Sequence, residues 1–495
     1  KLLLARGDIQ INQARTDGTT PLSIACQKND VKIVELLLDR DEIQINQAKE
    51  GGYTPLYSAC SDGHVDVVQI LLAREEIKIN QAADNGKTPL YIACGKGHVD
   101  VVKLLLARGD ILINVVKDNG VTPLYSACQN GHVGVVRLLL ARTGILINLA
   151  DNEGTTPLYI TCEKGHVDVM RLLLAKDDIQ INLVDKDGAT PLWIACQDGR
   201  ADVVRLLLAR GDIQINLALN NGTTPLFIAC QYGRAEVVRL LLSREEILIN
   251  RAVENGQTPL SITCEAGHVD VVRLLLASNQ SNHGEIQINQ ANMNGATPLY
   301  FACQMDRVDV VKLLLARGDI QINQARTDGS NPLYIACHMG YVKIVRLLLA
   351  RKEIQINQVR IDGSTPLYIA CFNGHVDMVR LLLAFVNWEM LVQSVPDGGA
   401  LWINWGALWS TAPVPLQQAF SNYYVHNKWP DDLIDHTRLV VADGAFTAAQ
   451  FDNITSFPTT TFHLNGFNIM EWEPGIDCPV RCLPCKHVHD AAFLQ

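Results

Sequence analysis

A proline recurs at a nearly constant interval along most of this chain of 495 residues. It always stands between Thr or Asn and Leu, and neighbouring copies are 34 residues apart except for one interval of 39 residues. The eleven copies are Pro21, Pro55, Pro89, Pro123, Pro157, Pro191, Pro225, Pro259, Pro298, Pro332 and Pro366. Self-similarity at this period predicts an array of stacked repeats, in which each unit contacts only its neighbours.

The copy Thr88–Arg108 shows how one repeat is expected to fold. Thr88 suits a helix N-cap because its hydroxyl can accept a hydrogen bond from a free amide of the first turn, and Pro89 suits the next position, where an N–H is not needed. Gly97 ends this first helix. The segment Val99–Ala107 predicts a second helix that is apolar on nearly all sides, so neighbouring repeats must cover it.

The segment after the second helix predicts a hairpin. Ile111-Leu112-Ile113 leads toward Asp118-Asn119-Gly120, which is a strong signal for a tight turn. Each unit is therefore expected to run helix, turn, helix, hairpin.

This unit resembles the ankyrin repeat, in which T-P-L-H-x-A opens the first of two antiparallel helices. The resemblance rests on the eleven T-P-L or N-P-L copies and on the run G-H-V-D-V-V at Gly63, Gly97 and Gly267, and it covers roughly residues 1–384. It implies an all-α repeat solenoid of helix-turn-helix units joined by β-hairpin loops.

The units depart from the ankyrin pattern in two respects. They are one residue longer than the usual period of about 33, and we place the extra residue in the I-Q-I-N segment before the hairpin. The His after T-P-L is replaced by an aromatic residue or Ser, at Tyr57, Tyr91, Tyr125, Tyr159, Trp193, Phe227, Tyr300, Tyr334, Tyr368, Ser23 and Ser261.

Eleven of the fourteen cysteines occupy one position of the repeat. A chain of disulfides is excluded by geometry, because equivalent positions of stacked helices lie about 8–10 Å apart whereas a disulfide needs Cα atoms within about 7 Å. We interpret these residues as small buried apolar groups, and free thiols in such number favour a reducing, cytoplasmic compartment. They are Cys26, Cys60, Cys94, Cys128, Cys162, Cys196, Cys230, Cys264, Cys303, Cys337 and Cys371.

A histidine often follows this cysteine, as His98 follows Cys94, and such a pair could suggest a nucleophile with its base. The pair recurs along the array, whereas an active site is built once. We therefore expect a structural role, in which the imidazole bonds to the neighbouring loop, and we predict no enzyme activity.

The sequence Arg-Gly-Asp also recurs, and it could suggest cell adhesion. Each copy follows a predicted second helix, where a Gly is expected to form a left-handed cap. Capping therefore explains the copies that begin at Arg6, Arg108, Arg210 and Arg317.

Charge and hydropathy exclude several classes of partner. The net charge is −10, of which residues 385–495 contribute −7, so a clustered basic face for nucleic acid is not expected. No run of 18 apolar residues appears, so no membrane span is expected in this chain; a membrane channel with an ankyrin arm stays open only if other parts of the gene encode spans. We predict a monomeric array with no cofactor.

The resemblance implies where a protein partner would bind. Partners of ankyrin arrays usually contact the concave surface made by hairpin tips and first helices, which points to the residues flanking the hairpin Gly and the two residues after the Cys. These positions vary most between the repeats of this chain, which favours a specific surface over simple drift. The predicted contact residues are Lys87, Gly95, Lys96, Gln129, Asn130, Glu163, Lys164, Trp193, Gln197, Asp198, Phe227, Gln231 and Tyr232.

Three aromatic residues of this set, Trp193, Phe227 and Tyr232, fall in adjacent repeats. Aromatic side chains are enriched among the residues that dominate binding energy. The aromatic residue after T-P-L is so regular, however, that packing between repeats explains most copies, and only Trp193 stands out as a contact.

One interval of the array is longer than the rest. Ser278–Gly284 carries about five additional polar residues. We expect a tolerated surface insertion after the second helix.

The repeats stop at Ala384, and residues 385–495 hold six of the seven tryptophans. We predict a separate Trp/Pro-rich C-terminal region of unassigned fold, for which a mixed α/β fold is one option. Its dense group of Cys478, Cys482, Cys485, His487 and His489 could complete a tetrahedral zinc shell, but the spacing lacks paired C-x-x-C motifs and we assign no metal site. The alternative function follows from this region: the array would be a targeting arm for a C-terminal effector or zinc-binding module.

The chain begins with Lys1–Arg6, which matches the end of a second helix. The simplest interpretation is a fragment that opens inside a repeat. The sequence as a whole predicts a non-catalytic scaffold that binds a protein partner on the concave surface of the array.

Overall fold

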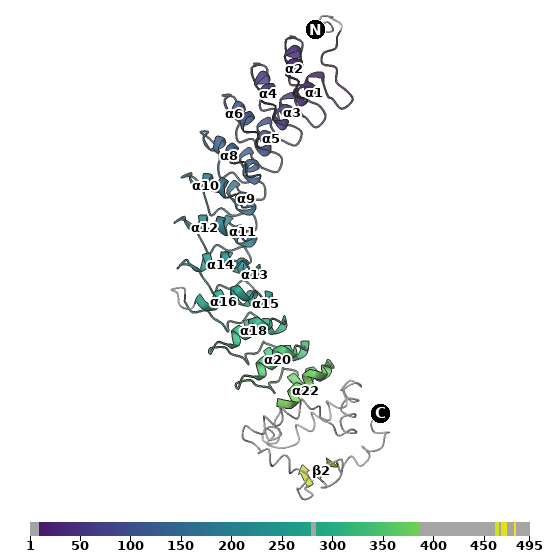
Figure 1. Cartoon of the computed structure of the whole chain (residues 1–495), viewed down its shortest axis with the longest axis vertical. Helices are drawn as coiled ribbons and strands as arrows, with labels where there is room; N and C mark the ends of the chain where they lie inside the picture. Colours follow the sequence, from purple (N-terminus) through teal and green to yellow (C-terminus); the bar gives the residue numbers. More distant parts are fainter. Residues whose placement is uncertain (1–8, 279–283, 386–460, 465–466, 473–479, 482–495) are drawn as a thin grey trace. The chain divides into compact units, whose positions relative to one another are not determined.

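The computed structural model describes residues 9–278, 284–385, 461–464, 467–472 and 480–481. In this part of the chain, two kinds of short helix alternate (Figure 1). The first helix of each repeat begins at the recurrent proline: α1 (Pro21–Gln27), α3 (Pro55–Asp62), α5 (Pro89–Lys96), α7 (Pro123–Gln129), α9 (Pro157–Lys164), α11 (Pro191–Asp198), α13 (Pro225–Gln231), α15 (Pro259–Ala266), α17 (Pro298–Gln304), α19 (Pro332–Met339) and α21 (Pro366–Phe372). The second helices are α2 (Val31–Leu38), α4 (Val65–Leu72), α6 (Val99–Leu106), α8 (Val133–Leu140), α10 (Val167–Leu174), α12 (Ala201–Leu208), α14 (Ala235–Leu242), α16 (Val269–Ala277), α18 (Val308–Leu315), α20 (Val342–Leu349) and α22 (Val376–Phe385).

The array divides into two units, and the division runs through α16. The N-terminal unit comprises Lys1–Glu254 and Leu274–Ile286, and the C-terminal unit comprises Asn255–Arg273 and Gln287–Gln495. Within the N-terminal unit each first helix packs on the next, from α1 to α13, and each second helix packs on the next, from α2 to α14. The same two rows of helices run from α15 to α21 and from α18 to α22 in the C-terminal unit. The predicted all-α repeat solenoid is confirmed.

The helix boundaries follow the predicted signals. The hydroxyl of Thr88 accepts a hydrogen bond from the backbone N–H of Tyr91, and Pro89 occupies the first position of α5. Gly97 ends α5 in the left-handed conformation, with φ of 78°. A Cβ atom on Gly97 would also lie 2.6 Å from Nδ1 of His132 in the next repeat, so both backbone and space require glycine here.

Within each unit, the core lies between the two rows of helices. Leu90 and Cys94 of α5, with Val101, Val102 and Leu105 of α6, are fully buried. Because the same positions are buried in neighbouring repeats, each helix pair covers the apolar face of the next.

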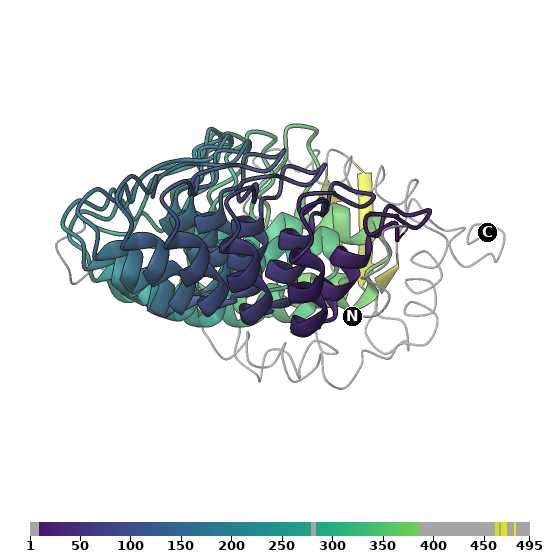
Figure 2. The same cartoon turned by 90° about the horizontal axis from the view of Figure 1, so that it is seen from above.

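The connections between repeats are turns rather than paired strands. The N–H of Ala83 bonds to the carbonyl of Lys87, and the N–H of Gly86 bonds to the carbonyl of Ala83, so the loop closes like a hairpin. Across the described repeats, however, bridge pairing of the β type is confined to Lys49 and Tyr53. The loops lie together along one side of the helices (Figure 2).

Three strands are described after the array: β1 (Thr461–Leu464), β2 (Phe467–Trp472) and β3 (Val480–Arg481). They form an antiparallel sheet in the order β1-β2-β3, with an irregularity between Phe462 and His463. The predicted domain boundary after Ala384 stays a prediction. None of the described helices is long and apolar enough to cross a membrane.

Candidate binding surface

In most repeats, a His or Arg just before the second helix bonds to the end of the first helix of the preceding repeat. Nε2 of His98 lies 2.9 Å from the carbonyl oxygen of Ser61. Where the repeat has arginine instead, Nε of Arg200 donates to the carbonyl of Glu163 at 3.2 Å. The same contact joins His64 to Gln27, His132 to Gly95, His166 to Gln129, Arg234 to Gln197, Arg307 to Glu265, and His375 to His338. The predicted structural role of the histidines is confirmed.

These bonds bear directly on the predicted contact residues. Gly95, Gln129, Glu163 and Gln197 are the residues after the Cys, and each uses its backbone carbonyl in this contact. Their backbone is therefore fixed by the next repeat, while the side chains of Gln129, Glu163 and Gln197 take no part in the bond. We call a position that presents its side chain to a partner a display position, and such a position requires this arrangement.

A row of asparagines forms a second set of bonds between repeats, which the sequence analysis did not anticipate. Nδ2 of Asn114 donates to the carbonyl of Gly144 at 2.8 Å, and its Oδ1 accepts from the N–H of Leu146 at 3.1 Å. The same pair of bonds is made by Asn12, Asn46, Asn80, Asn148, Asn182, Asn216, Asn289 and Asn323. We call these nine residues the asparagine ladder. The sequence signal from which these bonds could have been predicted is the Asn that ends each I-x-I-N segment.

The Arg-Gly-Asp copies are not helix caps, so that interpretation is wrong. Among the described residues, Gly109, Gly211 and Gly318 are absent from the glycines with positive φ. Arg108 instead donates through Nη1 to the carbonyl of Leu72, the last residue of α4, and through Nε and Nη2 to the carboxylate of Asp110. The hydrogen bonding from Arg108 to the carboxylate of Asp110 is the main reason that the pKa of Asp110 is lowered. The copy at Arg6 lies outside the described residues.

The aromatic residue after T-P-L packs between repeats. Nε1 of Trp193 donates to the carbonyl of Thr223 at 3.1 Å, and the hydroxyl of Tyr125 lies 3.0 Å from that of Thr155. Trp193 and Phe227 are both buried. These two side chains hold neighbouring repeats together and do not belong to an exposed contact surface. Sequence variation alone could not reveal which way they point.

The cysteines form a buried row, as expected. Among the described residues none of them is in a disulfide, and all but the half-buried Cys371 are buried. Burial raises the pKa of Cys26 to about 12 and that of Cys371 to about 11. A thiol whose pKa is raised in this way is a poor nucleophile at neutral pH.

The remaining predicted contact residues lie on one surface of the N-terminal unit, made by the ends of the first helices and the adjoining loops. We call it the first-helix surface. Its exposed members are Lys96, Gln129, Asn130, Lys164, Gln231 and Tyr232, and its half-buried members are Lys87, Gly95, Glu163, Gln197 and Asp198.

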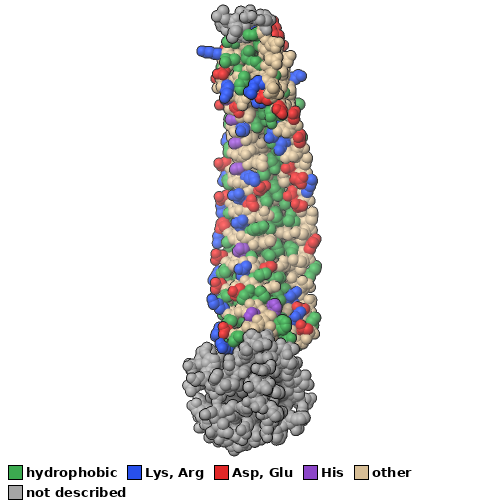
Figure 3. Space-filling model, turned by 90° about the vertical axis from the view of Figure 1, so that its right-hand side faces the viewer, with side chains coloured by type: hydrophobic (Ala, Val, Ile, Leu, Met, Phe, Trp, Pro, Cys, Tyr) green, Lys and Arg blue, Asp and Glu red, His purple; other side chains and the backbone are tan. Residues whose placement is uncertain are grey.

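Lys164 pairs with Glu163 at 2.5 Å, Lys87 lies over the ring of Tyr91, and Arg234 lies over the ring of Tyr232. The face that bears the first helices carries hydrophobic side chains along its middle with charged side chains at its margins (Figure 3).

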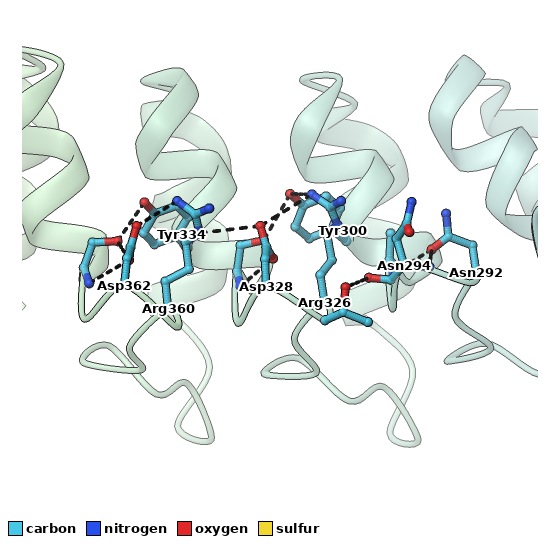
Figure 4. Close-up of polar contacts among 12 residues, drawn as sticks. Asn292, Asn294, Tyr300, Arg326, Asp328, Tyr334, Arg360 and Asp362 are labelled. Atoms are coloured by element: carbon cyan, nitrogen blue, oxygen red, sulfur yellow. Dashed lines mark hydrogen bonds and ion pairs between the residues drawn. The ribbon is translucent and has the colours of Figure 1, made fainter.

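The C-terminal unit has a distinctive polar network on its loops, which is shown in Figure 4. The guanidinium of Arg326 lies over the ring of Tyr300, and that of Arg360 lies over the ring of Tyr334. Asp328 stands between the two arginines, 3.9 Å from Arg326 and 3.5 Å from Arg360.

The network continues beyond Asp328. Arg360 reaches Asp362 at 3.1 Å, and Asp328 accepts hydrogen bonds from the backbone and hydroxyl of Ser330. Partial burial opposes ionisation of Asp328, but the bonds from Ser330 and the nearby arginines outweigh it and lower its pKa. Positive and negative groups therefore alternate and neutralise each other along this row.

The family model for ankyrin repeats in three copies matches overlapping segments along the array. The matched residues are 1–83, 78–151, 111–185, 144–219, 178–252, 214–283, 246–326 and 319–390. This chain belongs to the ankyrin-repeat family. No curated protein matches it. Ankyrin repeats are generally protein–protein interaction modules, and arrays of this kind are typically binding scaffolds rather than enzymes.

The cysteines and histidines that could bind zinc follow the ankyrin array in the sequence. Cys478, Cys482, Cys485, His487 and His489 lie outside the described residues. Within the described residues, no group of three or more His, Cys, Asp or Glu side chains is placed to hold a metal ion.

Proposed function

We propose that this ankyrin array binds a protein partner on its first-helix surface, without chemistry of its own. The observation that carries the proposal is the separation of roles within each repeat. The histidine bonds fix the backbone at the ends of the first helices, and the asparagine and arginine bonds fix the loops and the ends of the second helices. Side chains such as Lys96 and Asn130, by contrast, are exposed and vary between repeats. A rigid backbone with custom side chains lowers the entropy that binding must overcome.

Two lysines of one repeat provide the test. Lys96 lies at the end of α5 on the first-helix surface, and Lys103 lies exposed on α6. The full chain is used as bait, and captured proteins are quantified by mass spectrometry for the parent, for K96E combined with Y232A, and for K103E.

The proposal expects that at least one captured protein is reduced about tenfold by K96E with Y232A and is unchanged by K103E. Equal loss with K103E, or no loss with either variant, would place the partner elsewhere. The alternative of a C-terminal effector or zinc module depends on residues 385–495, and no described contact favours it.

A further inference from the structure

The ends of the first helices carry different side chains in the C-terminal unit than in the N-terminal unit. At the second position after the Cys, the C-terminal unit carries Ala266, Met305, Met339 and Asn373. The N-terminal unit carries Lys28, Asp62, Lys96, Asn130, Lys164, Asp198 and Tyr232 at this position. Met305 and Met339 are 38% and 41% exposed, and they belong to α17 and α19 or their ends, which pack on each other. An apolar residue therefore occupies the same display position in two neighbouring repeats.

Further apolar side chains of this unit are exposed at display positions. Met293 and Ile361, at equivalent positions of two loop tips, are 74% and 78% exposed, and Phe372 at the end of α21 is 61% exposed. We call Met293, Met305, Met339, Ile361 and Phe372 the methionine surface. Isolated exposed hydrophobic residues are common, but five at the loop tips and first-helix ends of one unit mark a candidate docking region.

In two loops of this unit, the arginines and aspartates already neutralise each other. Arg326 and Arg360 are balanced by Asp328 and Asp362, and the arginine faces stack on tyrosine rings. A carboxylate from a partner would compete with Asp328 and Asp362, and an ammonium would compete with the arginines. Either would leave a charge without its partner in the interface, which is costly.

We infer that the methionine surface binds an uncharged apolar segment of a protein partner, such as the apolar face of an amphipathic helix. The inference rests on the proposed function and names the chemistry of the segment. Methionine is unbranched and polarizable, so it adapts to differently shaped apolar groups, and it is enriched at interfaces of this type.

The methionines themselves provide the measurement, because their methyl groups give separate NMR signals. Met170 and Met378 are fully buried and serve as internal controls for Met293, Met305 and Met339. The full chain, labelled with ¹³C at the methionine methyl groups, is titrated with three synthetic amphipathic peptides of about 18 residues that share a Leu/Phe face. Their other faces carry Gln and Ser, Glu, or Lys.

The inference expects the neutral peptide to shift the three exposed methyl signals, leave the two buried ones in place, and bind at least about tenfold more tightly than either charged peptide. The double variant M305K with M339K should lose this binding at least tenfold. The matched variant N130K, which adds a lysine at the same position of the N-terminal unit, should keep it.

Four results would overturn the inference. The first two are tighter binding of a charged peptide and an equal loss of binding with N130K. The other two are seen without peptide: exposed-methionine methyl signals that shift with protein concentration, or signals that stay at chemical shifts typical of buried methionines. The last two patterns would mean that a second copy or another segment of this chain covers the surface. If natural partners still depend on Lys96 and Tyr232, only the inference fails and the proposed function stands.

Discussion

The two units of the array share their internal bonds and differ in the side chains they display. His132 contacts the carbonyl of Gly95 in the N-terminal unit, and His375 makes the same contact with His338 in the C-terminal unit. At the neighbouring display position, however, one unit carries Lys96 and the other Met339. The difference shows that this fold constrains the residues that bond between repeats and leaves adjacent residues free to determine what is bound.

The largest expected effect concerns the buried thiols that both units share. Burial raises the folded-state pKa of Cys26 to about 12, and buried tyrosines such as Tyr57 are raised in the same direction. These groups favour the folded state fully below their unfolded pKa, about 8.5 for a thiol, and that contribution is lost as the pH rises toward the folded value. Thermal unfolding followed by circular dichroism should give a much lower Tm at about pH 10.5 than at about pH 7.5. An unchanged Tm would contradict the burial of the cysteine row.

Replacing a buried leucine by alanine should lower the free energy of unfolding by similar amounts in the two units. Leu105 of α6 and Leu314 of α18 are equivalent and fully buried. Replacement of either by Ala is expected to cost roughly 2–5 kcal/mol through lost contacts and the cavity left behind. Urea unfolding of the two variants measures this, and a cost confined to one unit would show that their interiors are not equivalent.

Replacing two glycines of one repeat by alanine should affect the free energy of unfolding in opposite ways. Gly97→Ala places a side chain in a left-handed position against His132, so it should cost at least about 1–2 kcal/mol. Gly109 has open space around it and is not left-handed, so Gly109→Ala should be neutral or stabilise by up to about 1 kcal/mol. Destabilisation by Gly109→Ala in urea unfolding would restore the capping role for Arg-Gly-Asp.

The smallest effect on stability is expected at the display positions. Lys96→Met and Met305→Lys exchange the chemistry of the two units at exposed sites, and each should change the free energy of unfolding by less than about 0.5 kcal/mol. Binding of the neutral apolar peptide should nevertheless weaken with Met305→Lys. A large loss of stability in either variant would mean that these positions belong to the framework.

Much of this fold could be predicted because its helix boundaries depend on local chemistry. Thr88, Pro89 and Gly97 mark the limits of α5, and the structure agrees. The asparagine ladder was missed because its partners lie about one repeat away, and no local rule links Asn114 to Gly144. Trp193 was misjudged for a related reason: its burial depends on Thr223 of the next repeat.

The bond from Asn250 to the carbonyl of Glu285 spans 35 residues, whereas the corresponding bonds elsewhere span 30. The additional residues are thus accommodated without disturbing the register of the ladder, because each bond recognises an equivalent backbone position and not a fixed length of chain. Genes that duplicate, lose or interrupt such repeats can therefore yield foldable products, and the same junction offers protein engineers a natural point at which to insert a foreign peptide.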